Sequence, residues 1–355
     1  MGTYRLDRSY DWNYAHGPSY DGPPVRAAHT PLKDFFGVAV HSRIGIAAGL
    51  LLNARWIEFY ARMGFDILTY KTVRSRYRKC YRPPNWVYID RDQPINGGAR
   101  DMAERTRRRR PSALDRVTSS VSFGMPSRDP ELWMPDVGRA RAALGPGQAL
   151  IVSVVATPEP DTGAAQMAAE FGQLAAMAKD AGAQIVEANL SCPNVCTAEG
   201  DIFMDPALSG RIAAAMRQAV GRTPVLLKIG YIADNTLQRA VLRAVDGGAD
   251  GVILVNGVSR PVVTPAGTAA FGWGREIAGI LGAGIRDASL DRVRHAAATV
   301  AQDRLALRVI GVGGVATAED VGAYFDAGAY AVMMGSAPMY QPDLAAQFKA
   351  LHPEW

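Results

Sequence analysis

The sequence predicts an α/β protein built around a single (β/α)8 TIM barrel. Eight short apolar runs alternate with helical segments from about residue 44 onward. Nearly every run is apolar on both faces, which is typical of buried parallel strands. A chain of 355 residues has room for such a barrel with insertions. A doubly wound open sheet is the alternative architecture for the same alternation.

The predicted strands and helices follow one another in the order that a barrel requires. The strands are IGIAAG (44–49), FDILTY (65–70), ALIVSVV (149–155), QIVEANL (184–190), PVLLKIG (224–230), DGVILVN (250–256), LRVIGVGG (307–314) and YAVMMGS (330–336). The segment 164–181 illustrates the helices, since its apolar residues recur at the spacing of a buried helical stripe: Met167, Phe171, Leu174 and Ala178. After the seventh strand, Thr317 and Asp320 predict a capped helix start.

Two parts of the chain depart from this alternation. Residues 1–31 are rich in aromatic residues and proline without an apolar period, so we expect an extended or partly disordered arm. Residues 32–355 are assigned to the barrel, with an insertion at about 74–118. Long gaps follow the second and sixth strands. Because long βα loops lie at the C-terminal face of a barrel, we expect both near the active site.

Composition and charge limit the class of protein. No apolar run approaches the roughly 18 residues that span a bilayer, and the polar N-terminus is unlike a signal peptide. Three cysteines provide neither a disulfide framework nor a four-ligand zinc site. We therefore expect a cytoplasmic protein without membrane, metal or nucleic-acid partners. The net charge of +5 traces to residues 74–116, which hold 13 basic and 5 acidic residues. This insertion either guides an anionic substrate, binds a partner or is simply solvated.

Glycines after the last two strands predict a phosphate site. Gly313 and Gly314 end the seventh strand, Gly335 and Ser336 end the eighth, and a helix follows each pair. Backbone N–H groups approach an anion closely where glycine leaves space, and helix dipoles favour negative charge there. The alternative is two tight turns that need glycine for backbone geometry alone.

Two lysines and a cysteine supply candidate chemistry at the strand ends. Lys71 ends the second strand and Lys228 lies within the fifth, where a lysine is costly unless it is paired or used. Such a lysine serves as a Schiff base, as a cation beside a flavin or in an ion pair, and the alternative is a snorkelling side chain. The motif NLSCPN (189–194) places Cys192 between two amides, where a cysteine acts as a general base if its thiolate is accessible. A buried, inert cysteine is the alternative.

Together these motifs resemble the dihydroorotate dehydrogenase family over roughly residues 32–345, and also the dihydropyrimidine dehydrogenase flavin domain. The shared segments are IGIAAG, TYKT (69–72), NLSCPNV (189–195), LLKIG, DGVILVN, GILGAGIRDASL (279–290), VIGVGG and MMGS. The cysteine of NLSCPN resembles the soluble branch that uses a cysteine base. The membrane-bound branch carries serine there and an N-terminal membrane helix.

The resemblance implies an FMN enzyme. It implies cofactor contacts from Ala47, Ala48, Gly49, Lys71, Thr72, Ser153, Asn189, Lys228, Asn256, Gly282, Gly313, Gly314, Gly335 and Ser336. Cys192 and Lys71 become the catalytic residues, with Cys192 removing a proton while a hydride passes to flavin N5. Lys228 stabilises the anionic reduced ring. Substrate contacts are implied from Asn189, Asn194, Asn256, Val121, Phe123, Gly124 and Ser127.

The substrate half departs from the family pattern. Members that oxidise dihydroorotate carry I-N-x-x-G-x-x-N before the third strand, whereas this chain has SVSFGMPS (120–127). Gly124 is kept, but Val121 and Ser127 replace the two amides. Gly257 replaces the usual serine or threonine after Asn256. The loop after the sixth strand lacks its usual serine and proline, and the loop after the second is longer.

Several hypotheses about function remain open from sequence. We prefer a family member adapted to another substrate, such as a cyclic amide or a specialised metabolite, over a dihydroorotate dehydrogenase of pyrimidine biosynthesis. An aldolase with a Lys228 Schiff base and a non-enzymatic protein with a nucleic-acid-binding insertion are remote alternatives. A homodimer is implied by the resemblance. The electron acceptor stays open among fumarate, quinone, oxygen and NAD reached through a partner subunit, since this chain has no iron–sulfur cysteine cluster.

Overall fold

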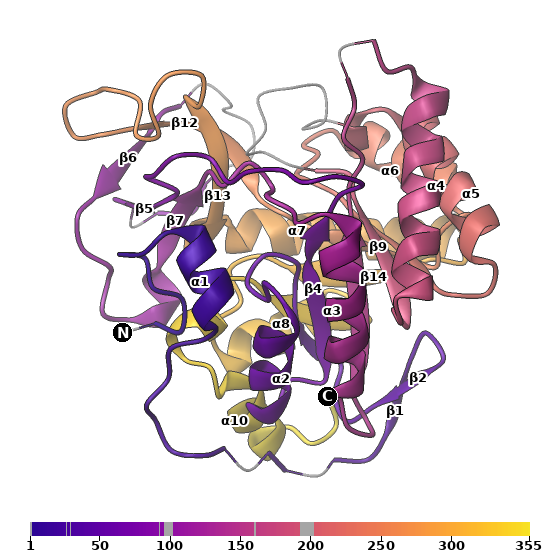
Figure 1. The fold of residues 1–355 in the computed structure, drawn as a ribbon, viewed down its shortest axis with the longest axis horizontal. Coiled ribbons are helices and arrows are strands. Elements are labelled where there is room, and N and C mark those ends of the chain that lie inside the picture. The colour runs from indigo at the N-terminus through magenta and orange to yellow at the C-terminus, as the bar shows by residue number, and fades with distance from the viewer. Residues whose placement is uncertain are drawn as a thin grey trace.

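Eight parallel strands form a closed barrel at the centre of the protein (Figure 1). The computed structural model describes residues 2–25, 27–28, 30–91, 93–95, 102–159, 161–191 and 202–355. In chain order, the barrel strands are β3 (Ile44–Ile46), β4 (Ile67–Val73), β8 (Ala149–Val154), β9 (Ile185–Asn189), β10 (Val225–Lys228), β11 (Gly251–Leu254), β14 (Arg308–Val312) and β15 (Ala331–Met334). Pairing of β15 with β3 closes the ring. The predicted barrel is confirmed, and closure excludes the open sheet.

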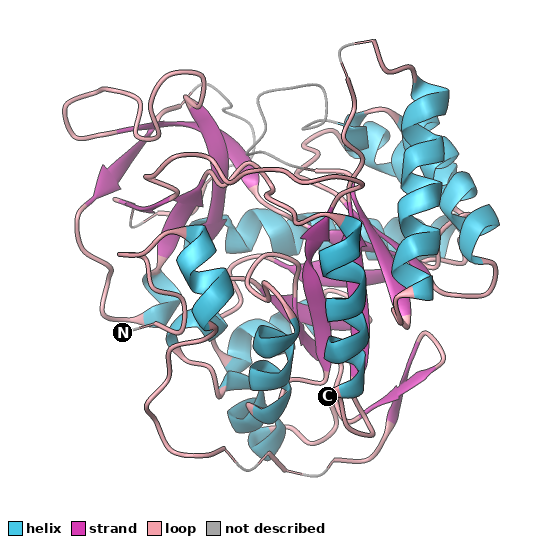
Figure 2. Ribbon diagram, viewed as in Figure 1, coloured by secondary structure: helices cyan, strands magenta, loops and turns pink. Residues whose placement is uncertain are grey.

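A helix covers the barrel after each of these strands (Figure 2). These helices are α2 (Ala54–Arg62), α3 (Pro130–Ala142), α4 (Ala164–Asp180), α5 (Pro206–Val220), α6 (Asn235–Val245), α7 (Arg286–Asp303), α8 (Ala318–Asp326) and α10 (Leu344–Leu351). The stripe predicted for 164–181 is buried along α4. The predicted cap of α8 is present, since Thr317 Oγ1 accepts from Asp320 N at 3.2 Å.

Apolar side chains fill the barrel interior and its N-terminal end. The interior cluster draws members from all around the barrel: Ala47, Ile67, Ala149, Ile151, Ile185, Leu226, Ile253, Ile310, Val312, Ala331 and Met333. The hairpin β1 (Lys33–Phe35) and β2 (Val38–Val40) adds Phe35 and Val40 to this cluster. Because the interior is packed at this end, a ligand can enter only from the C-terminal end of the strands.

The two long loops of the barrel fold together into a second, five-stranded sheet. Its strands are β5 (Trp86–Ile89), β6 (Glu104–Arg107), β7 (Thr118–Val121), β12 (Val258–Val263) and β13 (Ile277–Gly282). They pair in the order β12-β13-β7-β5-β6, and β6 also pairs with β12. This sheet lies at the upper left of Figure 1. The insertion expected at 74–118 is thus half of a unit that residues 258–282 complete.

The N-terminal segment, which was expected to be an extended or partly disordered arm, contains a helix. Residues Tyr10–His16 form helix α1, whose N-cap Ser9 accepts from Trp12 N. The Asn13 side chain donates to the Arg5 and Ser9 carbonyls, which folds the segment back on itself. Its seven residues are too few to show a helical period, and tertiary packing stabilises them. None of the helices within the described residues combines the length and the apolar character of a membrane span.

Candidate active site

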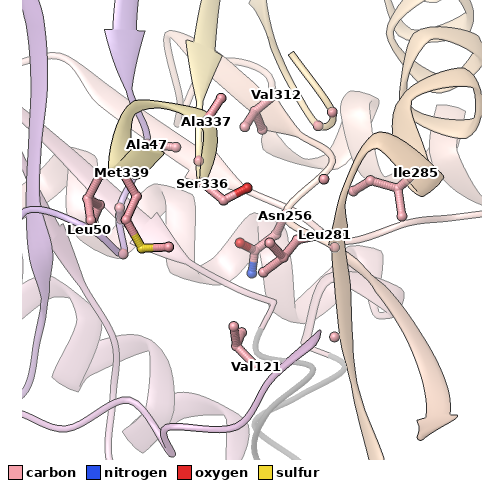
Figure 3. A pocket seen from close by; sticks show the side chains of 18 of the residues that line it. Ala47, Leu50, Val121, Asn256, Leu281, Ile285, Val312, Ser336, Ala337 and Met339 are labelled. Atoms are coloured by element: carbon pink, nitrogen blue, oxygen red, sulfur yellow. The ribbon is translucent and has the colours of Figure 1, made fainter. Parts of the chain in front are cut away.

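A large cavity opens at the C-terminal end of the barrel strands. Its empty space is about 1450 Å³, a figure that includes space open to solvent at its mouth. The ends of the barrel strands, the second sheet and the N-terminal segment all contribute to its wall. In Figure 3, Asn256 lies between Ser336 on one side and Val121 on the other. The Asn256 amide therefore stands between two parts of the cavity wall, one at the end of β15 and one at the end of β7.

Most of the predicted site residues meet in this cavity. Those that line it are Ala47, Ala48, Gly49, Lys71, Thr72, Val121, Phe123, Asn189, Lys228, Asn256, Gly282, Gly313, Gly314, Gly335 and Ser336. Gly124, Ser127 and Ser153 are described but do not line it. Cys192 and Asn194 lie outside the described residues, immediately after Ser191. Fifteen side chains or backbone segments chosen from sequence thus converge on one hollow.

Glycines leave open space in the half formed by β3, β14 and β15. A Cβ added at Gly335 or Gly49 would meet no atom within 4 Å, so this space belongs to the cavity. Gly314 has φ +71°, and a Cβ there would lie 2.6 Å from the Arg286 Cβ. Its backbone conformation thus requires glycine. Open glycine turns of this kind are the arrangement in which backbone N–H groups can approach an anion closely.

The start of helix α8 is less available to an anion than the sequence suggested. Asp320 Oδ2 accepts from Ala316 N at 2.9 Å and from Thr317 N at 3.0 Å, and the Asp320 N–H is used by Thr317. The capping box therefore occupies these donors with the chain's own groups. An anion in the cavity would rely on the glycine turns themselves.

The two predicted lysines both reach the cavity. Lys228, at the end of β10, is 2% exposed, and its Nζ donates to the Ala48 carbonyl at 3.2 Å. Lys71 lies in β4 at a register irregularity, and its backbone N donates to the Leu51 carbonyl at 2.8 Å. Of the described residues that line the cavity, these two alone carry a formal charge. Lys228 thus places a buried positive charge against the turn that follows β3.

A chain of hydrogen bonds runs beneath the cavity into the barrel. Ser153 Oγ donates to Glu187 Oε1 at 2.6 Å and lies 3.0 Å from Thr72 Oγ1. Asn189 Nδ2 donates to Thr72 Oγ1 at 3.4 Å. Since a hydroxyl has one proton, the chain runs from Asn189 through Thr72 and Ser153 to Glu187. Ser153, expected to contact the cofactor, instead connects the cavity wall to this carboxyl group.

Glu187 is a residue that the sequence analysis missed. It is fully buried, and its Oε2 has no hydrogen-bond partner among the described residues. Burial raises the pKa of Glu187, while the Lys228 charge and the Ser153 hydroxyl oppose the increase. The signal was present in the sequence, because QIVEANL carries one acidic residue within a buried strand.

The two described amides are fixed by the same backbone segment. Ser191 N donates to Asn189 Oδ1 at 3.3 Å, and Asn256 Nδ2 donates to the Ser191 carbonyl. Asn189 Nδ2 also approaches Met125 Sδ at 3.6 Å. The segment that leads to Cys192 is therefore attached to both amides at the cavity wall.

The loop 121–127 serves mainly to build the cavity wall. Val121, Phe123 and Met125 line the cavity, whereas Gly124 packs under a ring: a Cβ there would lie 2.7 Å from Tyr81. Ser127 Oγ accepts from Arg74 N at 3.0 Å and donates to the Arg128 carbonyl at 2.8 Å. Ser127 was expected to bind substrate, and the structure gives its hydroxyl a structural role away from the cavity.

Tyr4 and Tyr10 are further lining residues that the sequence did not reveal. Both come from the N-terminal segment and are 7% exposed. Other unpredicted lining residues are mostly apolar: Leu50, Leu52, Trp86, Leu114, Val117, Met125, Val255, Gly257, Gly279, Ile280, Leu281, Ala283, Ile285, Val312, Val315, Ala316, Ala337 and Met339. No motif marks them, because apolar wall residues look like core residues in sequence.

Comparison with known proteins identifies the family of this barrel. A family model described as dihydroorotate dehydrogenase matches residues 32–349. The chain belongs to the dihydroorotate dehydrogenase family. It is 30% identical to a dihydroorotate dehydrogenase of Dictyostelium discoideum over 97% of this chain and 96% of that protein. The protein is therefore an oxidoreductase of the dihydroorotate dehydrogenase type, and the predicted family is confirmed.

Other relatives of the dihydroorotate dehydrogenase family match part of the chain. The catalytic subunit of dihydroorotate dehydrogenase B (NAD(+)) from Solidesulfovibrio magneticus is 32% identical over 50% of this chain and 56% of its own length. Dihydroorotate dehydrogenase A (fumarate) from Limosilactobacillus reuteri is 32% identical over 46% and 51%. A crystal structure of the Eimeria tenella enzyme in complex with ferulenol has a TM-score of 0.72 at 16% identity, covering 96% of this chain and 89% of that one. That likeness supports the fold.

Proposed function

We propose that this protein is an FMN-dependent oxidoreductase that adds or removes two hydrogens at a C–C or C–N bond of a small cyclic amide or specialised metabolite other than dihydroorotate. One observation carries the proposal. A single cavity contains the open glycine turns at Gly49 and Gly335, which we call the glycine cradle, and the buried Lys228. In its opposite wall, Val121 replaces an amide of the family pattern, and the Ser127 hydroxyl is bonded to backbone groups outside the cavity. The cofactor half is retained and the substrate half is changed.

The cavity residues supply the open backbone and the positive charge that FMN would require. Gly313, Gly314, Gly335 and Ser336 would hold the phosphate, and the turn Ala47–Gly49 would lie against the ring. The open space at Gly335 and Gly49 is what a cofactor in close contact with backbone requires. Bound FMN supplies a two-electron acceptor. Lys228 would stabilise negative charge on the ring, which favours the reduced form.

The remaining chemistry belongs to residues around the substrate. Asn189 and Asn256 would hold the amide edge of the ring, together with Asn194, and Lys71 would lie beside them. Cys192 would take the proton from the substrate carbon as a general base. Asn194 and Cys192 lie outside the described residues, so their roles rest on the family resemblance. The attachment of Ser191 to both described amides supports a substrate position near Cys192.

A second candidate is dihydroorotate oxidation in pyrimidine biosynthesis. The relation to the Dictyostelium discoideum protein over nearly the whole of both chains favours it. Against it, two amides of the family pattern are absent, and each buried polar group left unmatched costs about 1–3 kcal/mol. Dihydroorotate should therefore bind at least about tenfold more weakly than to a site with both amides. The oxidoreductase character of the family speaks against the Lys228 aldolase.

The decisive experiment is anaerobic reduction of the purified protein. Its visible spectrum should show flavin, and mass spectrometry of the heat-released cofactor should identify FMN. Dihydroorotate, dihydrouracil and substituted dihydropyrimidines are then mixed with the protein in a stopped-flow instrument. Fast flavin reduction by dihydroorotate, comparable to that of a housekeeping enzyme, would reject the preferred substrate class. A colourless protein that does not bind added FMN would reject the whole proposal.

The general base is tested by a pair of cysteine variants. Cys192→Ser should slow flavin reduction by a good substrate about 10²–10⁴-fold at neutral pH, because a serine hydroxyl is a far weaker base. Cys196→Ser is the matched control, four residues further along the same segment. Wild-type reduction rates in Cys192→Ser, or equal losses in both variants, would remove Cys192 from the mechanism.

We also infer a cytoplasmic homodimer with a separate electron acceptor. The dimer and its compartment rest on the family resemblance. The match to a catalytic subunit of an NAD(+)-linked enzyme supports an electron-transfer partner. Light scattering gives the oligomeric state, and reoxidation of the reduced protein by fumarate, quinone or oxygen separates the acceptors. Reoxidation by none of these would favour a partner subunit.

A further inference from the structure

Three aromatic rings from distant parts of the chain meet on the cavity wall. Tyr4 packs edge-on against Phe123 with ring centroids 6.1 Å apart, and Tyr10 packs against the same ring at 6.3 Å. All three residues line the cavity. Phe123 belongs to the loop after β7, which matches the family motif expected to contact the substrate. The two tyrosines come from the N-terminal segment. The aromatic wall, as we call Tyr4, Tyr10 and Phe123, therefore borders the substrate half.

The segment that carries both tyrosines is fixed to the barrel near Tyr4. Thr3 N donates to the Met339 carbonyl at 2.7 Å, and Thr3 Oγ1 lies 2.7 Å from Tyr60 Oη. Tyr60 in turn donates to the Pro338 carbonyl at 3.0 Å. These bonds attach the segment to helix α2 and to the short helix α9 (Ala337–Tyr340) that follows β15. Tyr4 is thereby held in place without help from a ligand.

Helix α1 holds Tyr10 in place in the same way. Asn53 Nδ2 donates to the Tyr14 carbonyl at 2.7 Å, and Trp56 Nε1 donates to the Asn13 carbonyl at 3.3 Å. Arg128 and Asp11 form an ion pair of 2.7 Å. A wall organised before binding adds affinity, because little side-chain freedom is lost when the ligand arrives.

The surroundings of the aromatic wall are apolar. Trp86, Leu114, Val117, Val121 and Met125 line the same cavity, and the two charged lining residues among those described lie on barrel strands β4 and β10. Apolar surface removed from water contributes about 25 cal/mol per Å². A purely polar ring would gain little from these contacts. A ring that carries an apolar group would gain affinity from them.

We propose that the substrate is a cyclic amide with an alkyl or aryl substituent, and that the aromatic wall binds this substituent and sets specificity. The inference rests on the proposed function. The reacting ring would take its hydrogen bonds from Asn189 and Asn256. The substituent would extend toward Tyr4, Tyr10 and Phe123, which line the same cavity as the two amides. The N-terminal segment is then part of the binding site.

The test compares ligand pairs that differ only in the substituent. Uracil, orotate and 6-benzyluracil are titrated into the FMN-loaded protein, and perturbation of the flavin spectrum gives each Kd without turnover. The wild type should bind 6-benzyluracil at least about tenfold more tightly than uracil. Tyr4→Ala and Tyr10→Ala should reduce this ratio toward one, and Tyr4→Phe should keep it. Trp12→Ala is the matched control, because Trp12 stacks on His16 away from the cavity.

The outcomes separate this inference from the function beneath it. A protein without bound flavin overturns the proposed function. If the flavin-loaded protein binds uracil or orotate as tightly as 6-benzyluracil, the substituent-binding role of the aromatic wall is rejected and the proposed function is not. An equal loss of preference in Trp12→Ala rejects this role too. An effect of the tyrosine variants confined to reoxidation by an apolar quinone would also overturn it, because the wall would then bind the electron acceptor.

Discussion

Replacing Gly335 by alanine tests the cofactor site without disturbing the fold. Gly335 follows β15, lines the cavity and is exposed to it. Its φ lies outside the left-handed region, and an added Cβ would meet nothing within 4 Å. Alanine at a compatible φ commonly stabilises a protein by about 0.4–1 kcal/mol through the unfolded state. The free energy of unfolding of flavin-free Gly335→Ala should therefore not fall.

The same methyl group should weaken FMN binding. It would stand where the phosphate must approach the backbone N–H to about 2.9 Å. Loss of one hydrogen bond to a charged group costs about 1.5–3 kcal/mol. Since about 1.4 kcal/mol corresponds to a tenfold change, the Kd for FMN should rise about tenfold to a hundredfold. Riboflavin lacks the phosphate, so its Kd should change much less.

The assay is a fluorescence titration of flavin-free protein with FMN and with riboflavin. Gly145→Ala is the control, since Gly145 also has an open position for a Cβ, with only Gln148 Oε1 at 3.8 Å, but lies on the surface after α3. It should leave both dissociation constants unchanged. An unchanged FMN affinity in Gly335→Ala would refute the contact between the FMN phosphate and the backbone at Gly335. A parallel loss for riboflavin would place the contact at the ring instead.

Two predictions concern buried ionisable groups. Burial raises the pKa of Glu187 above its ordinary value of 4.5, so the stability that this group contributes is present below pH 4.5 and is lost as pH rises through the folded-state pKa. The Glu187→Gln variant lacks this loss, so the free energy of unfolding of the variant relative to wild type should rise with pH in urea unfolding. A difference that stays constant with pH would refute the prediction. Lys349 and Asp66 form an ion pair of 2.9 Å with both side chains 2% exposed, so Lys349→Met should cost about 3–5 kcal/mol. The double variant Lys349→Met/Asp66→Asn should recover part of the lost free energy of unfolding. A loss below about 1 kcal/mol in Lys349→Met would contradict the stabilising role of this ion pair.

The barrel was predictable because its strands are buried on both faces. Such strands form continuous apolar runs, and glycines, lysines and amides at their ends interrupt those runs visibly. Lys228 is an example, since a cation within LLKIG is conspicuous. Helix signals were also local: the Thr317 cap of α8 depends on residues three positions apart. Where a structural signal is contained in neighbouring residues, the sequence predicted it.

The second sheet was not predictable for the opposite reason. Strand β6 reads ERTR and strand β7 reads TSSV, and neither has an apolar period. Their pairing partners lie far away in the chain: Glu104 pairs with Val262, and Val121 with Gly279. Tertiary pairing overrides local propensity in such strands. Tyr4 was missed likewise, because its position depends on backbone carbonyls that carry no sequence signal.

The structure also narrows the role of the basic insertion 74–116. Several of its arginines have structural partners: Arg91 donates to both Glu104 oxygens at 2.7 and 2.9 Å, and Arg110 lies 4.7 Å from the Tyr340 ring centroid. Of its described residues, only Trp86 and Leu114 line the cavity. The described arginines of the insertion therefore lie outside the cavity wall, and any effect of theirs on an anionic substrate would be long-range. Their electrostatic effect would raise the association rate and would fall with ionic strength. In the proposed function, the lysines, the amides and the aromatic wall would select the substrate, and the charge of the insertion would act only on how fast an anionic substrate arrives.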